Sequence, residues 1–457
     1  MRIDRRDFAS LGLASIAFAG FARAAAGGDG HYRSEVRGYG ALRDDPERLL
    51  DLPDGFSYRV ISSAGERMDD GFATPDKFDG MACFGLGGGR VALVRNHELS
   101  PRDRAIGPTR GEAGLEAALA KLPFYGADAE GRVLPGGTST IVYDTRRERR
   151  QAVHLSLAGT AVNCAGGMTP WGSWLSCEET NLAAPDVAKS HGWVFEVPAA
   201  QRGLAAPVPL TALGRFRHEA AAVDPRTGIV YLTEDEGDSL FYRLLPNAKG
   251  RLTSGGRLQA LAFVDGTKDS RNWNGIAFPA RARRAVKWID LDGTDSPDSD
   301  LRKRGAAAGA ALFARGEGIH RGNRDFYFTC TSGGAAKIGQ IMRYRPSRFE
   351  GQKGEAGEPA TLENFVESAS SEVLDYGDNL TVAPWGHLIV CEDRSGSATN
   401  YLRGVTPEGR VYAIARLRVD TELAGACFSP DGKILFLNIY RPGKTVAITG
   451  PWASVRS

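Results

Sequence analysis

Several well-known catalytic signatures are missing from this 457-residue sequence. It has only seven histidines, no His-Glu-x-x-His segment and no Cys-x-x-Cys pair, so nothing in it indicates a zinc site. It also has no glycine-rich loop of the kind that cradles phosphates, and no Gly-x-Ser-x-Gly turn. The lack of that turn leaves a serine-hydrolase mechanism without support.

Charge of one sign and long apolar runs are also scarce. The formal net charge is +2, and no basic patch is interleaved with aromatic residues, so we expect no nucleic-acid partner. The apolar run from Leu11 to about Ala22 is short and weakly hydrophobic for a helix that spans a membrane. We therefore expect no permanent membrane anchor.

The same run has a different meaning when its flanks are considered. Arg5 and Arg6 precede it and small residues around Ala24 and Ala26 end it, which is typical of a twin-arginine export signal. An ordinary secretory signal or a membrane anchor is the less favoured alternative. We expect residues 1–26 to be a twin-arginine signal peptide, the twin-arginine translocase to be a partner, and the mature protein to be periplasmic or secreted through this pathway.

Glycine is abundant, with 57 residues against an average of about 7%. Six times along the chain a polar residue opens a short apolar stretch, a turn follows, and a second apolar stretch ends in another polar residue. A hairpin would fold each unit and bring its polar ends to one edge. The six units span residues 79–98, 163–179, 218–236, 315–332, 378–393 and 425–438.

Unequal spacing between these units indicates propeller blades that carry loop insertions. We predict an all-β fold, a six-bladed β-propeller with loop and short helical insertions, in which residues 27–457 form a single β-propeller catalytic domain. The polar ends would then converge on one rim of the central channel. All units but the last carry an acid there. A single such acid is best explained as solvated, but crowded acids need protons or cations to offset their repulsion.

Cysteine is sparse, and its placement argues against a disulfide framework. Cys164 stands at the polar rim beside Asn163, where it could ligate a metal as a thiolate, although a buried inert cysteine is the competing interpretation. Carboxylates with an asparagine favour calcium, and a lone thiolate among them leaves room for iron. The other cysteines fall within predicted strands, where a small apolar side chain packs: Cys83, Cys177, Cys330, Cys391 and Cys427.

One long segment and several shorter motifs resemble those of the PhoX-type alkaline phosphatases. The long segment runs from Asn163 to Glu179 and contains Cys164-Ala-Gly-Gly, Thr-Pro-Trp-Gly-Ser-Trp and Cys-Glu-Glu. The shorter motifs follow in the family's order: Gly214 to Glu219, Arg315-Gly316-Glu317-Gly318, Asp378-Asn379-Leu380 and Val390 to Asp393. The resemblance covers most of the chain after the signal segment.

This resemblance implies a metal-dependent alkaline phosphatase that hydrolyses small phosphomonoesters at an oxo-bridged cluster of Fe³⁺ and Ca²⁺ in the channel mouth. Cys164 would be the iron-ligating thiolate, and Arg315 would bind the phosphoryl oxygens; these two are the predicted catalytic residues. The implied metal ligands are Cys164, Glu178, Glu179, Glu219, Glu317, Asp378 and Asn379, with Glu178 the least certain.

Two other functions stay open at the level of sequence. A calcium-dependent lactonase or a phosphotriesterase-like hydrolase could use the same fold, and such enzymes usually need only calcium. A non-catalytic periplasmic binding propeller could hold calcium as a structural clasp. It would need neither the thiolate of Cys164 nor the guanidinium of Arg315. We expect the protein to be a monomer.

Overall fold

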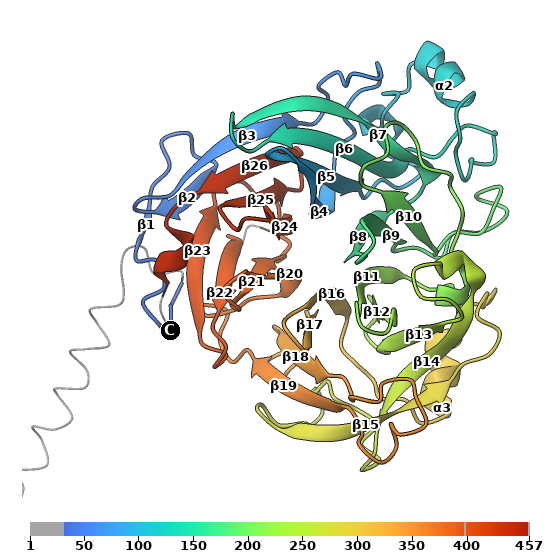
Figure 1. Cartoon of the computed structure of the whole chain (residues 1–457), viewed down its shortest axis with the longest axis vertical. Helices are drawn as coiled ribbons and strands as arrows, with labels where there is room; N and C mark the ends of the chain where they lie inside the picture. The colour runs from blue at the N-terminus through green and yellow to red at the C-terminus, as the bar shows by residue number, and fades with distance from the viewer. Residues whose placement is uncertain (1–31, 397–398, 456–457) are drawn as a thin grey trace, which may run out of the picture.

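The computed structural model describes residues 32–396 and 399–455, and within these ranges the regular secondary structure is almost entirely β-strand. The predicted signal peptide, residues 1–26, lies outside the described residues. Figure 1 shows strands arranged as sheets around a common axis, in a propeller-like ring. The prediction of an all-β, propeller-like fold is confirmed. Within the described ranges, no helix is long and apolar enough to cross a membrane.

The strands form five antiparallel sheets. The first sheet has, in spatial order, β4 (Phe78–Gly87), β5 (Arg90–His97), β6 (Gly136–Asp144) and β7 (Arg149–Thr160), and the second has β8 (Asn163–Met168), β9 (Ser173–Glu178) and β10 (Val194–Pro198). The third and largest sheet has nine strands in the order β11 (His218–Val223), β12 (Val230–Glu234), β13 (Tyr242–Pro246), β14 (Gly256–Phe263), β15 (Arg283–Asp290), β19 (Thr361–Glu367), β18 (Gln340–Arg345), β17 (Phe326–Cys330) and β16 (Gly316–Arg321). The fourth sheet has β20 (Gly377–Val382), β21 (Leu388–Glu392), β22 (Tyr401–Val405), β23 (Val411–Leu417), β2 (Leu50–Pro53) and β1 (Leu42–Arg43), and the fifth has β24 (Leu423–Phe428), β25 (Ile434–Ile439), β26 (Lys444–Thr449) and β3 (Ser57–Ser63).

Helices are few and short. They are α2 (Ala113–Leu119) and α3 (Leu301–Ala307), with 3₁₀ turns η1 (Arg104–Ile106), η2 (Thr211–Leu213), η3 (Leu252–Ser254) and η4 (Trp452–Ser454). Both α-helices lie on the outside of the ring in Figure 1.

Each predicted hairpin is present, and its first strand is the innermost of its sheet. The pairs are β4–β5, β8–β9, β11–β12, β16–β17, β20–β21 and β24–β25. The first strands contact one another in a closed circuit, from β4 through β8, β11, β16, β20 and β24 back to β4. This inner ring of strands lines the axis.

Early strands close the ring by pairing with late ones. β3 adds to β26 in the last sheet, and β2 adds to β23 in the sheet before it. Apolar side chains also fill the space between the two halves of the nine-stranded sheet; Phe241, just before β13, stacks on Phe328 in β17 with ring centroids 4.4 Å apart. All six cysteines are buried free thiols.

Small residues allow the inner strands to approach one another closely. A Cβ added to Gly167 in β8 would lie 1.9 Å from the carbonyl oxygen of Ala221 in β11, and one added to Gly80 would lie 2.6 Å from Cα of Ala165. These neighbours are backbone atoms, which cannot move aside as a flexible side chain can.

The close packing of the inner ring predicts a specific cost for one added methyl group. Gly167→Ala should lower the free energy of unfolding by about 1–3 kcal/mol, because the strand must shift to relieve the clash. Gly114→Ala in α2 is the matched control, since the added methyl group meets no atom within 4 Å. Urea denaturation of both variants measures the difference. Equal stability of the two variants would contradict this account of the ring.

Candidate metal centre

Every inner strand has a β-bulge near its start. There the pairing with the second strand of the hairpin is interrupted, and two consecutive residues of the inner strand are left out of the regular register. The register shifts fall between Phe78 and Met81, Asn163 and Gly166, His218 and Ala221, Gly316 and Ile319, Gly377 and Leu380, and Ala424 and Cys427. A bulge bends its strand and re-aims the side chains it contains. The bulged pairs are Asp79-Gly80, Cys164-Ala165, Glu219-Ala220, Glu317-Gly318, Asp378-Asn379 and Gly425-Ala426.

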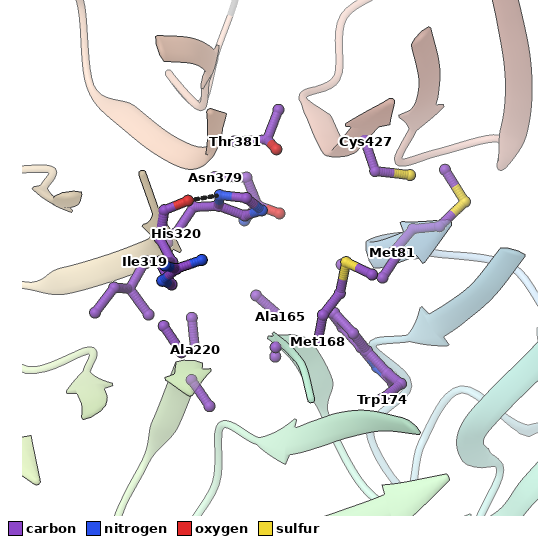
Figure 2. Close-up of a pocket in the computed structure, with 18 of the residues that line it drawn as sticks. Met81, Ala165, Met168, Trp174, Ala220, Ile319, His320, Asn379, Thr381 and Cys427 are labelled. Carbon is purple, nitrogen blue, oxygen red and sulfur yellow. Dashed lines mark hydrogen bonds between the residues drawn. The ribbon is translucent and has the colours of Figure 1, made fainter. Parts of the chain in front are cut away.

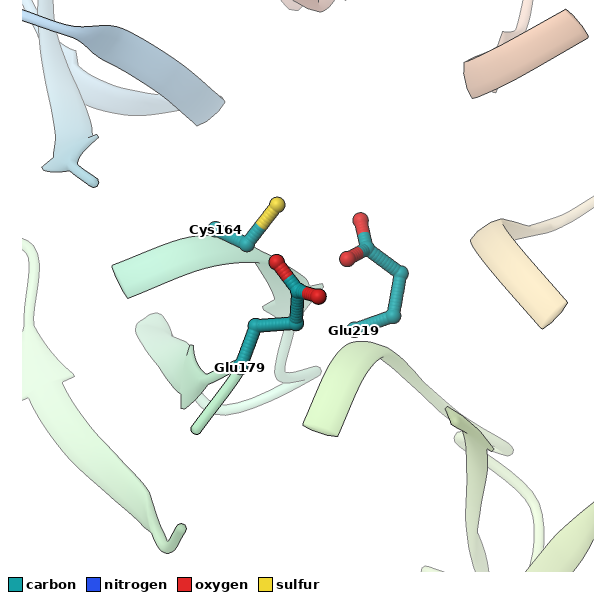
Figure 3. Close-up of side chains that lie close together, drawn as sticks. All are labelled: Cys164, Glu179 and Glu219. Atoms are coloured by element: carbon teal, nitrogen blue, oxygen red, sulfur yellow. The ribbon is translucent and has the colours of Figure 1, made fainter. Parts of the chain in front are cut away.

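In five of the six bulged pairs, all but Gly425-Ala426, the first residue is an acid or a cysteine. Cys164, Glu179 and Glu219 form one group whose potential ligand atoms lie within 4.8 Å of one another, and Figure 3 shows the thiol and both carboxyl groups turned toward a shared space. Glu219 also belongs to a second group with Glu317 and Asp378. The structure therefore brings five of the predicted ligands together from four different inner hairpins.

Two further groups extend this cluster, and apart from Asp378 their acids were not assigned as ligands in the sequence analysis. One consists of Asp79, Glu98 and Glu422, and the other of Asp378, Asp393 and Glu422. Because Glu219, Asp378 and Glu422 are each shared by two groups, the potential cation positions are contiguous. We call the nine residues of the four groups the acidic ring: Asp79, Glu98, Cys164, Glu179, Glu219, Glu317, Asp378, Asp393 and Glu422.

Glu219 is the strongest sign that this ring holds cations. Its side chain is 1% exposed, and neither carboxylate oxygen has a hydrogen-bond partner. A buried carboxylate without a partner is costly, because nothing replaces the water it has lost. The donor set of the ring, carboxylates with one thiol, is the kind that hard cations and iron accept. The residues present therefore fit a metal centre.

Burial and mutual repulsion disfavour the charged forms of these groups. Burial is the main cause of the raised pKa of Glu219, and the charges of Asp378 and Glu179 add to it. Burial, followed by the charge of Asp393, raises the pKa of Asp378 to about 8. The pKa of the Cys164 thiol is raised well above its ordinary value by burial and then by Asp79. Bound cations would reverse these shifts and favour the thiolate and carboxylates.

Arg315 reaches the acidic ring by a route that the sequence did not predict. Arg315 is not part of the extended strand that contains Glu317, since it immediately precedes β16 with a φ of 53°. Its guanidinium nevertheless lies 3.1 Å from the Glu317 carboxylate and is 41% exposed. Asp235 accepts two hydrogen bonds from it, from Nε at 2.7 Å and from Nη2 at 3.0 Å. The positive charge thus stands at the edge of the cluster.

The structure does not bring Glu178 to the ring. Adjacent residues of an extended chain point to opposite sides, and Glu178 points away from the side of Glu179. Its Oε1 lies 2.6 Å from Nδ1 of His191 and accepts a hydrogen bond from the amide of Ala161, while Oε2 accepts one from the amide of Gly192. With both oxygens engaged, Glu178 orders the loop after β9 and does not join a ligand group.

Asn379 lies beside Asp378 but is turned differently. Its carbonyl oxygen accepts a hydrogen bond from the amide of Gly425 at 3.1 Å, and its Nδ2 lies 3.4 Å from Asp378 Oδ1. Asn379 therefore ties β20 to β24 within the inner ring. Its role as a metal ligand stays a prediction.

Glu422 is the residue that sequence reasoning missed. The sixth bulge has Gly425 at the position where the other five have an acid or a thiol, so this hairpin has no ligand of its own there. Glu422, which immediately precedes β24, provides a carboxylate instead. The missing side chain at Gly425 is the signal that could have directed attention to the acid just before the strand.

The second residues of the bulged pairs line a separate cavity of about 290 Å³ along the axis. Ala165 and Ala220 border it with Met81, Met168 and Ile319, as Figure 2 shows. Five of the six bulges thus separate an acid or cysteine of the acidic ring from a following residue that lines this mainly apolar cavity. The acidic ring and the cavity are different environments built by the same six strands.

The raised pKa values predict how the metal-free protein responds to pH. Carboxyl groups with folded pKa values above the unfolded value of about 4 bind protons more tightly in the folded state. The free energy of unfolding should therefore fall as pH rises from about 4 towards the folded pKa, about 8 for Asp378. Calorimetry should show the Tm of metal-stripped protein falling across this interval. Calcium-loaded protein should change less, so the gap between the two widens with pH.

Glu219→Gln provides the control for this prediction, because it keeps the shape of the side chain and removes one titrating group. The Tm of the metal-stripped variant should depend less steeply on pH than that of the wild type. A Tm of the metal-stripped wild type that rises across this interval would contradict the assignment.

Comparison with known proteins places this geometry in a family. A family model described as alkaline phosphatase PhoX matches residues 37–443. PhoX of Pseudomonas fluorescens, solved with vanadate as a transition-state analogue, is similar in structure, with a TM-score of 0.65 and 20% identity over 91% of this chain and 97% of that one. A gluconolactonase from Xanthomonas campestris matches at a TM-score of 0.40 and 11% identity, over 92% of this chain and 100% of that one. No curated protein sequence matches this chain. The family match, over a range that contains the whole acidic ring, shows that the chain belongs to the PhoX family of metal-dependent alkaline phosphatases.

Proposed function

We propose that this chain hydrolyses small phosphomonoesters at the acidic ring, with a mixed cluster of iron and calcium ions held in the channel mouth. The observation that carries the proposal is Glu219, whose buried carboxylate has no hydrogen-bond partner and belongs to two adjacent groups of potential ligands. A carboxylate in this position is suited to bridge two cations. Family membership supports the reaction type.

The composition of each group supports a particular division of cations. Cys164 provides the one sulfur ligand, so the group that it forms with Glu179 and Glu219 would hold iron. The groups made of carboxylates alone would hold calcium, which prefers oxygen ligands. When bound, these cations would polarise the phosphoryl oxygens, stabilise the leaving oxygen and activate the attacking one.

Arg315 supports substrate binding directly. Its guanidinium is half-exposed at the edge of the ring, and Asp235 holds it by two hydrogen bonds. A planar guanidinium fixed in this way can donate paired hydrogen bonds to a phosphoryl group. Because Asp235 has already ordered it, little reorganisation is needed as charge develops in the transition state.

The overall charge of the mouth sets the condition for binding. A phosphomonoester dianion would be repelled by a ring of ionised carboxylates. With cations in the ring, the mouth becomes attractive to an anion, and Arg315 adds to the field from one side. Glu219 and Glu317 would then hold the cations, and their neutralised carboxylates would no longer repel the substrate.

The proposal includes the finer architecture and the route of export. The nine-stranded sheet would count as two blades, β11–β14 and β16–β19, that β15 joins by pairing with β14 and β19; with the four remaining sheets this makes six blades. Residues 27–457 would form one domain. Residues 1–26 would direct export through the twin-arginine translocase, leaving a monomer without a membrane anchor in the periplasm or outside the cell.

The test is hydrolysis of p-nitrophenyl phosphate at alkaline pH by protein exported in a native-like host. We expect activity with calcium present and its loss when a chelator removes calcium, because the mouth then repels the dianion. Activity should return when calcium is restored. Metal-replete protein without phosphatase activity would contradict the proposal.

Cys164→Ala tests the sulfur ligand within the same assay. Loss of a metal ligand should lower both iron content and activity, by about 100-fold or more, since even outer partners of ligands usually cost 10–100-fold. Cys330→Ala in β17 is the matched control, because Cys330 is also buried and belongs to none of the four ligand groups. Full activity of Cys164→Ala would overturn the assignment of the thiolate and favour a centre that needs only calcium.

A further inference from the structure

Two arginines stand in matching positions around the acidic ring. The sequences Arg217-His218-Glu219 and Arg315-Gly316-Glu317 place an arginine two residues before a ring glutamate, at the entrances of β11 and β16. These two inner strands are neighbours in the ring. The side chains of Arg217 and Arg315 are exposed to a similar degree, 39% and 41%.

Asp235 lies between these arginines. It immediately follows β12, its carboxyl side chain is 9% exposed, and its amide donates a hydrogen bond to the carbonyl oxygen of Arg217 at 3.3 Å. Its carboxylate holds Arg315 at 2.7 and 3.0 Å and lies 4.0 Å from Nη2 of Arg217. One buried carboxylate thus orders two half-exposed guanidinium groups.

Each arginine also contacts one carboxylate of the acidic ring. Arg217 donates a hydrogen bond to Glu179, and Arg315 forms an ion pair with Glu317. If cations neutralise Glu179 and Glu317, Asp235 remains as the only carboxylate paired with both arginines. Two positive charges then face one negative charge. The charge of Glu236 also acts on Arg217, but Glu236 lies 3.7 Å from Arg302. This side of the mouth is therefore left with positive charge that Asp235 alone does not balance.

From this arrangement we propose that Arg217 is a second substrate-binding guanidinium, which contacts the phosphoryl group opposite Arg315, and that Asp235 is the positioning residue for both arginines. The inference rests on the proposed phosphatase function and extends it. Two forked guanidinium groups would recognise the terminal dianionic phosphoryl group of a monoester and discriminate against diesters, which offer fewer free oxygens and less charge. Arg217 would thus contribute to specificity as well as affinity.

Steady-state kinetics of metal-replete Arg217→Gln test the first part. KM for p-nitrophenyl phosphate and the inhibition constant of inorganic phosphate should each rise about tenfold, which corresponds to the loss of one charge-assisted hydrogen-bonding group. Iron and calcium contents should match the wild type. Arg226→Gln is the control, because Arg226 is also half-exposed but lies in the turn at the far end of the same hairpin. It should leave both constants unchanged.

Asp235→Asn distinguishes a role of Asp235 in orienting the two arginines from a purely electrostatic effect of its charge on the substrate. Removing a negative charge beside the substrate would lower KM if Asp235 acted only through its field. Loss of the fork that holds Arg315 and orients Arg217 should instead raise KM and the phosphate inhibition constant several-fold. Asp235→Glu, which retains the charge and can restore part of the pairing, should lie between Asp235→Asn and the wild type.

The outcomes distinguish this inference from the function on which it rests. Inactive wild-type enzyme would remove the proposed function itself. Active wild type with unchanged KM and phosphate inhibition in Arg217→Gln would overturn only the role of Arg217. Loss of metal from Arg217→Gln, with full activity after metal is restored, would also overturn it, because Arg217 would then act only through Glu179. A lower KM in Asp235→Asn would overturn the positioning role.

Discussion

The mouth of this propeller-like ring depends on keeping like-charged groups where water cannot solvate them. Glu219 is the extreme case, since neither oxygen of its buried carboxylate has a hydrogen-bond partner and the carboxylates of Asp378, Glu179 and Asp79 act on it. Protons can relieve the repulsion, because burial and the neighbouring carboxylates raise the pKa values of Glu219 and Asp378. Cations relieve it better, because they favour the charged ligands and make the mouth attractive to an anionic substrate. The same constraint therefore links stability, metal binding and substrate binding.

The six inner bulges, of two residues each, position most of the ring residues on the inner strands. Five of the bulges present one residue to the acidic ring, and all six turn the next residue toward the axial cavity. Rigid neighbours hold these bulges, since Gly80 and Gly167 let the strands touch backbone to backbone. Pairing of β3 with β26 closes the ring and fixes the last sheet relative to the first. Ligands far apart in the chain are thereby held in one place before any ion arrives.

Much of this arrangement could be predicted from sequence, because hairpin ends repeat. The alternation of apolar and polar residues identified the hairpins, and a shared axis then required Cys164, Glu219 and Asp378 to meet. What could not be predicted depends on local departures from regular strands. Arg315 has a left-handed backbone that no periodic pattern specifies. Glu178 pairs with His191, and the position of His191 depends on the conformation of the loop between β9 and β10. Glu422 occupies no repeat position at all, and only folding brings it beside Asp79.

The most direct test of the central claim is X-ray absorption at the iron edge, together with total metal analysis, on protein exported and purified without added chelator. The account predicts iron with one sulfur neighbour in the wild type, calcium in the same molecule, and loss of the sulfur signal in Cys164→Ala. Fully active protein that contains neither cation, or iron whose surroundings are the same with and without Cys164, would contradict it.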